Sequence, residues 1–360
     1  MSQKCQSPGM RVLVILLVVA GCKSSSQTSS PPAGDYCRGQ ALRAPGATPT
    51  LGTQTGSEVR PAHTFSIVAR DPVTGDLGVA VQSHYFGVGS VVVWAEAGVG
   101  AVATQSFVEP AYGPRGLGLM RDGIAAPDAM AQLVAADKQA SVRQLGFIDA
   151  RGRVASHTGA KCIGVAASHV GTGYAVQANI MANDRVVPAM AAAYEAAKGD
   201  LADRMLAALD AAQAAGGDLR GCQSAAILVV SGTRSDTPWK EKKLDLRVED
   251  SADPLRELRR LVVLGRAYDQ ENQGDLAVEK HDIDAAVEHY GNATRIAPDN
   301  IEMVYWSAVS LAGAGRVDQA IPMFKRAFSA DRAWQELTRR LVTAGLLPQP
   351  AADRVLKDAR

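Results

Sequence analysis

The stretch that decides the fold is TFSIVARD, residues 64–71. It begins with a threonine, continues as an apolar run suited to a β-strand, and leads into a turn with Pro72 and Gly75. The next run, LGVAVQS at residues 77–83, has the same character, so the two predict a β-hairpin. Thr64 therefore heads a strand. If Thr64 became a chain terminus, its own amine could act as the base for its own hydroxyl.

Short apolar runs bounded by turn residues continue beyond this hairpin. Further strands are expected at 91–95, 99–105, 144–149, 153–157, 174–180, 224–230 and 244–248. Helices are expected at 129–136, 186–197 and 201–215. This order does not fit alternating βαβ units. It favours an α+β fold in which two antiparallel sheets pack face to face with helices outside. The wholly apolar runs 91–93 and 225–230 are typical of strands covered on both faces.

The N-terminus resembles a bacterial lipoprotein signal. Basic Lys4 and Arg11 precede the apolar run 12–20, which is too short to cross a bilayer and is typical of a secretory signal. The run ends VAGC at residues 19–22, which resembles a lipobox with Cys22 as the lipidated residue. A short buried helix with an incidental cysteine is the alternative. The prediction is a signal peptide over 1–21 and a lipid anchor in the bacterial cell envelope, on the periplasmic side or in the outer membrane.

Residues 22–62 are rich in Ser, Thr, Pro, Gly and Gln, which predicts a flexible tether after the lipidated cysteine. The charges balance, with 38 Lys and Arg against 37 Asp and Glu, so the chain has no net positive charge large enough to attract nucleic acid, and no nucleic-acid partner is expected. Without the signal peptide and Cys22, the cysteines left are Cys37, Cys162 and Cys222, which allow one disulfide at most. The pair Cys162–Cys222 is favoured because both lie in the folded region. No motif for a metal or another cofactor is present.

The C-terminal part, residues 251–360, is expected to be all helical and repetitive. Asp284, Ala286, Tyr290 and Ala293 recur 34 residues later as Asp318, Ala320, Phe324 and Ala327, and 34 residues is the tetratricopeptide period. Two such repeats fall short of the three or so that independent stability usually needs. Flanking helices near 255–268 and 334–344 are therefore expected to cap the pair or to dock it on the first domain.

Four segments and two shorter ones resemble one family. These are residues 63–71, 77–83, 98–105 and 112–117, together with SHTG at 156–159 and DLRV at 245–248. They look like a bacterial and archaeal family described only as uncharacterised N-terminal-nucleophile (Ntn) hydrolase-like proteins. The resemblance covers about residues 64–260. It implies a four-layer αββα Ntn-type sandwich over 63–250 and names no substrate. Family members commonly begin Met-Thr-Phe-Ser, whereas here a signal and a tether precede Thr64.

Several polar residues are candidates to assist Thr64. Ser83 and His84 at the end of the paired strand would bring a hydroxyl and an imidazole, and Asn179 resembles an amide donor for an oxyanion. Weaker candidates are Asn183, Gln105 with Ser106, and His157. Ordinary hydrogen bonding and turn capping are the alternatives for each of these residues. Glu96 stands roughly where proteasome-like enzymes place a lysine, and a glutamate there would not lower the pKa of the amine.

Two functions follow. The first is a membrane-tethered Ntn-type hydrolase of a small amide or peptide, with Thr64 as nucleophile after cleavage of the His63–Thr64 bond. The second is a catalytically silent lipoprotein that binds an envelope protein or peptide through its tetratricopeptide-like helices. Neither function requires a cofactor.

Overall fold

The structure is a computed structural model that describes residues 64–359. The predicted signal peptide, Cys22, the tether and Cys37 lie outside the described residues. Among the described residues, none of the helices has the length and apolar character needed to cross a membrane.

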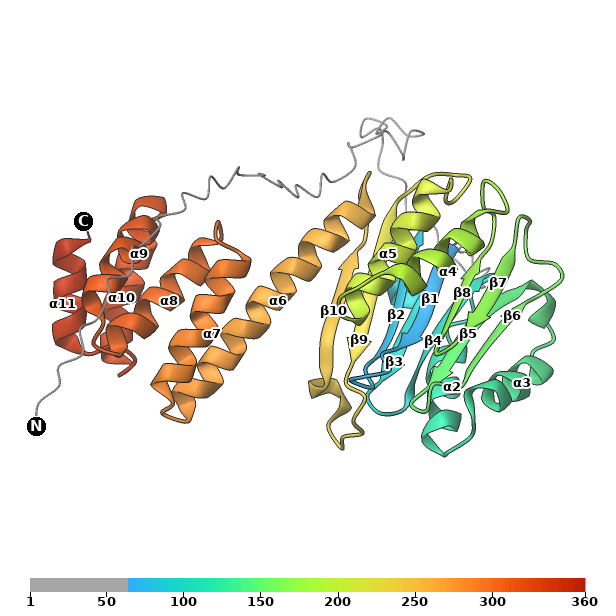
Figure 1. The fold of residues 1–360 in the computed structure, drawn as a ribbon, viewed down its shortest axis with the longest axis horizontal. Helices are drawn as coiled ribbons and strands as arrows, with labels where there is room; N and C mark the ends of the chain where they lie inside the picture. Colours follow the sequence, from blue (N-terminus) through green and yellow to red (C-terminus); the bar gives the residue numbers. More distant parts are fainter. Residues whose placement is uncertain (1–63, 360) are drawn as a thin grey trace, which may run out of the picture. The chain divides into compact units, whose positions relative to one another are not determined.

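Thr64 heads one of the two central strands of a six-stranded antiparallel sheet (Figure 1). The strand order is β10-β9-β2-β1-β8-β7. The strands are β1 (Thr64–Arg70), β2 (Leu77–Ser83), β7 (Ala167–Gly171), β8 (Tyr174–Ala178), β9 (Ser224–Val230) and β10 (Lys242–Val248). In β1 and β2 Thr64 is paired with Ser83 and Arg70 with Leu77, as the predicted hairpin requires.

The second sheet has four antiparallel strands in the order β3-β4-β5-β6. They are β3 (Val93–Glu96), β4 (Gly100–Ser106), β5 (Arg143–Asp149) and β6 (Val154–Thr158). The two sheets share an apolar core, to which both contribute alternate residues such as Val79 and Ala103.

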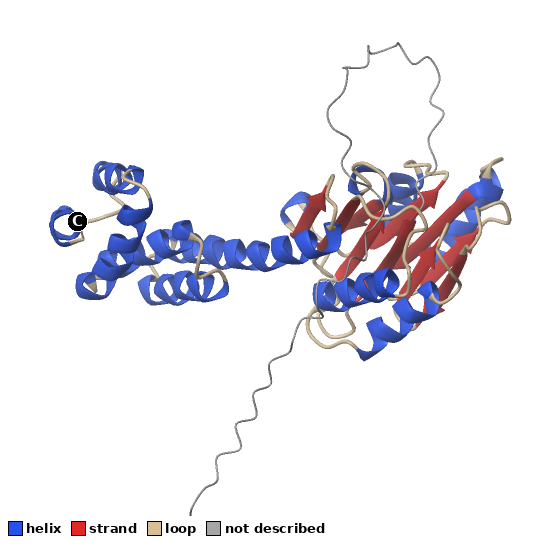
Figure 2. Ribbon diagram, turned by 90° about the horizontal axis from the view of Figure 1, so that it is seen from above, coloured by secondary structure: helices blue, strands red, loops and turns tan. Residues whose placement is uncertain are grey.

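Helices cover the outer face of each sheet, and the two views agree on these layers (Figures 1 and 2). The first sheet packs against α4 (Val186–Ala196) and α5 (Leu201–Ala214). The second packs against α2 (Tyr112–Arg121) and α3 (Ala126–Ala136). Short helical turns lie between strands, namely α1 (Gly89–Val92), η1 (Ala140–Val142) and η2 (Pro238–Lys240). The expected α+β class with antiparallel sheets is confirmed.

Helices alone follow β10. They are α6 (Pro254–Glu279), α7 (Ile283–Ile296), α8 (Ile301–Gly313), α9 (Val317–Ala330), α10 (Ala333–Thr343) and α11 (Gln349–Asp358). The side chains of Asp253, Asp282 and Asn300 cap the first, second and third of these at their N-termini. The first turns of α6 pack into the core between α5 and the first sheet through Leu255, Leu258 and Val262.

The 34-residue repeat has a structural counterpart. Ala286, Tyr290 and Ala293 lie on α7, and their equivalents Ala320, Phe324 and Ala327 lie on α9. All six side chains are buried, so the repeated positions are those that pack each helix against its neighbours. The predicted helical region is confirmed, and its tetratricopeptide character stays a prediction.

Three details of the sequence analysis need correction. The strand expected at 91–95 begins two residues later, because residues 89–92 form the short helix α1 and β3 starts only at Val93. Helix α2 and edge strand β7 were not predicted. Glycine dilutes the helical pattern of α2, and β7 is exposed and so lacks an apolar signal. The pair Cys162–Cys222 is wrong, because Cys162 is a free thiol while Cys222 is disulfide-bonded.

Candidate functional site

One end of the space between the sheets is polar. On β1 the inward side chains run from Val68 to Thr64, on β2 from Leu77 to Ser83, on β4 from Ala101 to Gln105, and on β5 from Ile148 to Gln144. Each strand therefore presents apolar side chains at one end and a polar one at the other. Strand pleating places these residues on a common face, so the four polar ends meet. Thr64 lies in this polar end and is fully buried.

Thr64 is held at its hydroxyl and at its carbonyl. Its Oγ1 donates to Ser83 Oγ over 3.3 Å. Its carbonyl oxygen accepts from the backbone N–H of Asn179 at 3.0 Å and from Gln105 Nε2 at 3.3 Å. Three strands, β1, β2 and β4, and the residue that follows β8 thus fix the position of one threonine.

Five fully buried residues form a band of hydrogen bonds beside Thr64. We call it the amide band: Ser66, Gln105, Gln144, Gln177 and Asn179. Gln144 Oε1 accepts from both Gln105 Nε2 and Asn179 Nδ2, each at 2.8 Å. Ser66 Oγ donates to Gln105 Oε1 and accepts from Gln177 Nε2, each at 2.6 Å. Two of these bonds, Ser66 to Gln105 and Asn179 to Gln144, cross from one sheet to the other. Polar groups are costly to bury in a core unless they bond to one another.

A glycine makes room for the band. An added Cβ at Gly146 on β5 would lie 2.5 Å from Gln177 Oε1, closer than such atoms approach. The missing side chain therefore lets the β8 glutamine extend across to β5. The sheets approach each other closely at this point because of that residue.

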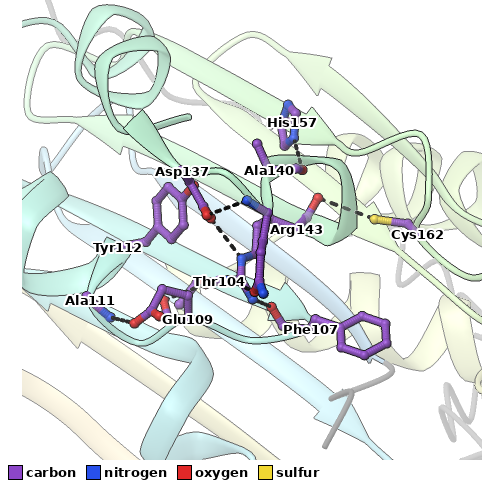
Figure 3. A network of polar contacts seen from close by, with 11 residues as sticks. Thr104, Phe107, Glu109, Ala111, Tyr112, Asp137, Ala140, Arg143, His157 and Cys162 are labelled. Carbon is purple, nitrogen blue, oxygen red and sulfur yellow. Dashed lines mark hydrogen bonds and ion pairs between the residues drawn. The ribbon is translucent and has the colours of Figure 1, made fainter. Parts of the chain in front are cut away.

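The loop after β4 is anchored by Arg143, at the start of β5 (Figure 3). Its Nε donates to Asp137 Oδ2 at 2.9 Å, Nη1 to the carbonyl of Phe107, and Nη2 to Gln139 Oε1 at 2.8 Å. Ser106, between Gln105 and that loop, has a φ of 70°, in the left-handed region that a serine rarely adopts. Arg143 thus holds the strained turn that follows Gln105 of the amide band.

The pKa values of the groups around Arg143 are determined by burial and by their hydrogen bonds and ion pairs. Burial pushes the pKa of Asp137 up, but bonds from Arg143, the Gln139 backbone and Tyr112 outweigh it and leave the pKa below its usual value. Tyr112 donates to the same carboxylate at 3.0 Å, and burial followed by that bond raises the pKa of its phenol. Nearby Cys162 donates to the Arg143 carbonyl at 3.3 Å, and burial raises its thiol pKa, which makes it a poor nucleophile.

The structure brings two of the three predicted partners to Thr64. Ser83 meets its hydroxyl. Asn179 meets its carbonyl through the backbone, while the Asn179 side chain binds Gln144. His84 follows β2 and does not join them: its backbone N–H donates to Asp218 Oδ2 at 3.1 Å, and its imidazole lies beside Gly221.

The weaker candidates divide. Gln105 joins the amide band, as described above. Asn183 caps the end of a helix by donating to the carbonyl of Ala215, at 2.7 Å, and His157 Nε2 is bonded to the carbonyl of Ala140, at 2.9 Å. Glu96 lies at the other end of the sheet from Gln105 and forms an ion pair with Arg121. Each of these three side chains thus has a partner outside the amide band.

Sequence reasoning missed Ser66, Gln144, Gln177 and Arg143. The signal was present for the first three, since each is a polar residue at an inward position of an otherwise apolar strand. Arg143 gave no local signal, because its partners lie on segments that only the fold brings together.

A hollow of about 230 Å³ adjoins this arginine's network and is lined by residues such as Tyr112, Arg115 and Asp137, none of them in the amide band. Within residues 64–359 no group of His, Cys, Asp and Glu is arranged to hold a metal.

Comparison with known proteins gives a family and a fold. A crystal structure of a protein from Silicibacter pomeroyi, itself assigned to a family of unknown function, is similar over 60% of this chain and 92% of that chain, with 29% identity and a TM-score of 0.51. No curated protein matches the sequence. The family model matches residues 64–258, from the head of β1 to the first turns of α6. The chain therefore belongs to the family of unknown function DUF1028.

Proposed function

We propose that residues 64–250 form an Ntn-type hydrolase domain in which Thr64 is the nucleophile for cleavage of an amide or peptide bond. The layered arrangement of two antiparallel sheets between helices agrees with that superfamily, and the family match begins at Thr64 itself. The observation that carries the proposal is the position of Thr64: a buried hydroxyl at the head of a strand, fixed by Ser83, Gln105 and Asn179.

The chemistry requires a free amine at Thr64, so the His63–Thr64 bond must first be hydrolysed. The Thr64 amine then takes the proton from Oγ1 while Oγ1 attacks the substrate carbonyl and forms a tetrahedral oxyanion. Collapse of that intermediate breaks the C–N bond, and the same proton passes to the leaving amine. Water then attacks the acyl ester on Thr64, releasing the carboxylic acid and restoring the hydroxyl.

The amide band supplies candidate groups for positioning and for the oxyanion. Gln105 Nε2 and the Asn179 backbone N–H both donate to the carbonyl of Thr64 itself, so their part in the proposal is to position the nucleophile. The Asn179 side chain is engaged with Gln144, so a role as oxyanion donor would require it to change partner. Ser83 Oγ accepts from the Thr64 hydroxyl, which makes it the candidate to relay the proton from that hydroxyl to the amine.

The test combines mass analysis with activity. The mature protein, recovered from its host, is analysed by N-terminal sequencing and assayed against a library of acyl amides and dipeptides. We expect a species that begins at Thr64, with hydrolysis lost in Thr64→Ala and partly kept in Thr64→Ser. Thr338→Ala is the matched control, because Thr338 is equally buried but lies on α10. Hydrolysis that survives Thr64→Ala would refute the proposal.

A second candidate is a catalytically silent protein that binds a polypeptide partner through α6–α11. Its specific support is that Thr64 is fully buried in a chain that continues upstream of it. The lipid anchor and the cell-envelope location belong to both candidates and remain proposals that rest on residues 1–62. Globomycin, an inhibitor of lipoprotein processing, would cause the unprocessed precursor to accumulate if Cys22 is lipidated.

A further inference from the structure

Helix α6 carries a glutamate where its buried stripe calls for an apolar residue. Its inward positions run Val262, Ala267, Glu271, Gly274 and Ala277, at helical spacing. Glu271 is only 7% exposed, and its Oε1 has no hydrogen-bond partner. It lies between two small apolar clusters, one around Ala267 and one around Ala277. A carboxylate in such a position is costly to bury unless something pairs with it.

Its nearest charges have the same sign. Burial, then Glu302 on α8, then Asp275 one turn along α6 raise the pKa of Glu271 to about 7. Glu302 accepts a bond from the phenol of Tyr268 at 2.7 Å, and Asp275 accepts one from Tyr290. We call the three carboxylates the acidic recess: Glu271 is buried, Glu302 is half-buried and Asp275 is exposed.

The basic groups close to the acidic recess are engaged elsewhere. Arg266 on α6 is paired with Asp200 at 2.7 Å and with Asp203 at 2.9 Å. Arg295 on α7 binds Asn292, and His289 binds Gln270. Among the described residues, none of the three recess carboxylates has an ion-pair partner, although most charged residues around them do.

A metal ion does not fit these groups as they stand. No set of three acidic, histidine or cysteine side chains in residues 64–359 converges closely enough to hold one. A long basic side chain fits better, because its charged end can lie beside the more exposed Glu302 and Asp275, where the charge of Glu271 also acts on it, while its stem lies against apolar and aromatic surface. The partly exposed ring of Tyr268, whose hydroxyl bonds to Glu302, adds surface suited to a cation.

We propose that the acidic recess of Glu271, Asp275 and Glu302 binds an arginine or lysine side chain of a partner polypeptide. This rests on the second candidate function, in which the helices bind a polypeptide, and gives that partner a chemistry. Arginine suits the recess better than lysine, since its planar guanidinium can donate to two carboxylates at once.

The experiment uses the full chain and three short probes: triarginine, trilysine and tricitrulline, the last being uncharged but of the same shape as triarginine. Affinity is measured by calorimetry, and the Glu271 carboxylate is followed by carbon NMR. We expect saturable binding of triarginine, weaker binding of trilysine and none of tricitrulline, with a downward shift of the Glu271 titration on binding. Glu271→Gln should weaken binding by about tenfold or more, because truncation of a buried charged partner is costly.

Glu288→Gln is the matched control, since Glu288 is an exposed acid on neighbouring α7 and the substitution is the same. It should leave triarginine binding within about twofold, as expected for a surface charge. A merely structural Glu271 would make Glu271→Gln less stable, whereas a ligand-binding Glu271 leaves the free protein at least as stable.

Three results would overturn the inference. They are equal affinity of triarginine for wild type and Glu271→Gln, no binding of triarginine at all, or binding of calcium in preference to either peptide with the same NMR shift. The readout does not involve hydrolysis, so Thr64→Ala protein should bind as wild type does. A failure here therefore leaves the hydrolase proposal standing, and the reverse holds as well.

Discussion

The polar end of the sheets and the acidic recess both place polar side chains inside the molecule, but only in the first do most of these side chains bond to one another, with Gln177 Oε1 as the exception. Around Thr64, neutral amides and hydroxyls bond across two sheets. Around Glu271, like charges face one another and one buried oxygen has no partner. Neutral groups that bond to one another rigidify a core, whereas like charges held close together leave a cost that a ligand can remove.

This difference separates two kinds of site. The amide band holds a candidate nucleophile in place before any substrate arrives. What the proposed activity still requires there is a covalent change, the hydrolysis that releases the Thr64 amine. The acidic recess lacks a counter-charge, so the missing event there is binding. A substitution in one of these two regions should leave the other region unchanged.

The largest effect is expected at Thr64. Once the amine is free, Thr64→Ala should lower the hydrolysis rate by about 1000-fold or more, because the nucleophile itself is removed. Steady-state kinetics on the best amide substrate measures it, and triarginine binding should not change. A loss of less than tenfold would place the nucleophile elsewhere.

The next effect concerns the anchor of the β4 loop. Arg143→Met should cost about 3 kcal/mol of unfolding free energy, because it leaves Asp137 without its guanidinium partner. Chemical denaturation measures the change. Arg115→Met is the matched control, since Arg115 is exposed and should change stability by about 0.5 kcal/mol or less. Equal effects of the two variants would contradict the role assigned to Arg143.

A smaller cost is expected where the sheets approach most closely. Gly146→Ala should destabilise the domain by about 2 kcal/mol, since the new methyl group would collide with Gln177. Gly118→Ala on α2 is the control: it meets nothing within 4 Å and should be neutral or stabilising. Thermal unfolding of both variants compares them. No loss on Gly146→Ala would show that the amide band tolerates a wider spacing of the sheets.

The smallest effect is a pH dependence in the helices. Because the pKa of Glu271 is raised to about 7, the folded state holds a proton that the unfolded state has released. The contribution of protonated Glu271 to the free energy of unfolding is fully present below the ordinary pKa of a glutamate, and it is lost as the pH rises through about 7. Between pH 5 and pH 8 the free energy of unfolding should fall by on the order of 2 kcal/mol more in the wild type than in Glu271→Gln.

Hydrogen exchange of the α6–α8 amides at the two pH values measures this difference. The facing groups are Glu302, Asp275, Tyr268 and Tyr290, and the raised pKa of each tyrosine keeps it protonated throughout the range. If Glu271→Gln shows the same pH dependence as wild type, the charge of Glu271 is already compensated and the recess has no vacancy for a cation.

The sequence was most informative where a pattern has a single physical reading. The hairpin that starts at Thr64 and the apolar run of β9 lie where predicted, because strand alternation and turn residues are local signals. Of the site, Thr64 beside Ser83 followed from the same hairpin register. Asn179 was assigned to the right place, although it reaches Thr64 through its backbone.

The rest depended on contacts between distant segments. The amide band crosses between the two sheets through the bonds of Ser66 to Gln105 and of Asn179 to Gln144, and no local pattern gives the distance between the sheets. The cysteine pairing failed because proximity in the folded region was assumed for Cys162 and Cys222 without a geometry. Glu271 was overlooked because an acidic residue within a charged helix is ordinary until its neighbours show that it is buried.

The central claim is that Thr64 acts through an amine of its own. The most direct measurement is intact-mass analysis and N-terminal sequencing of active protein purified from its native host. The account predicts a polypeptide that begins at Thr64 in every preparation that hydrolyses an amide. Hydrolysis by protein whose chain is continuous through the His63–Thr64 bond would contradict it.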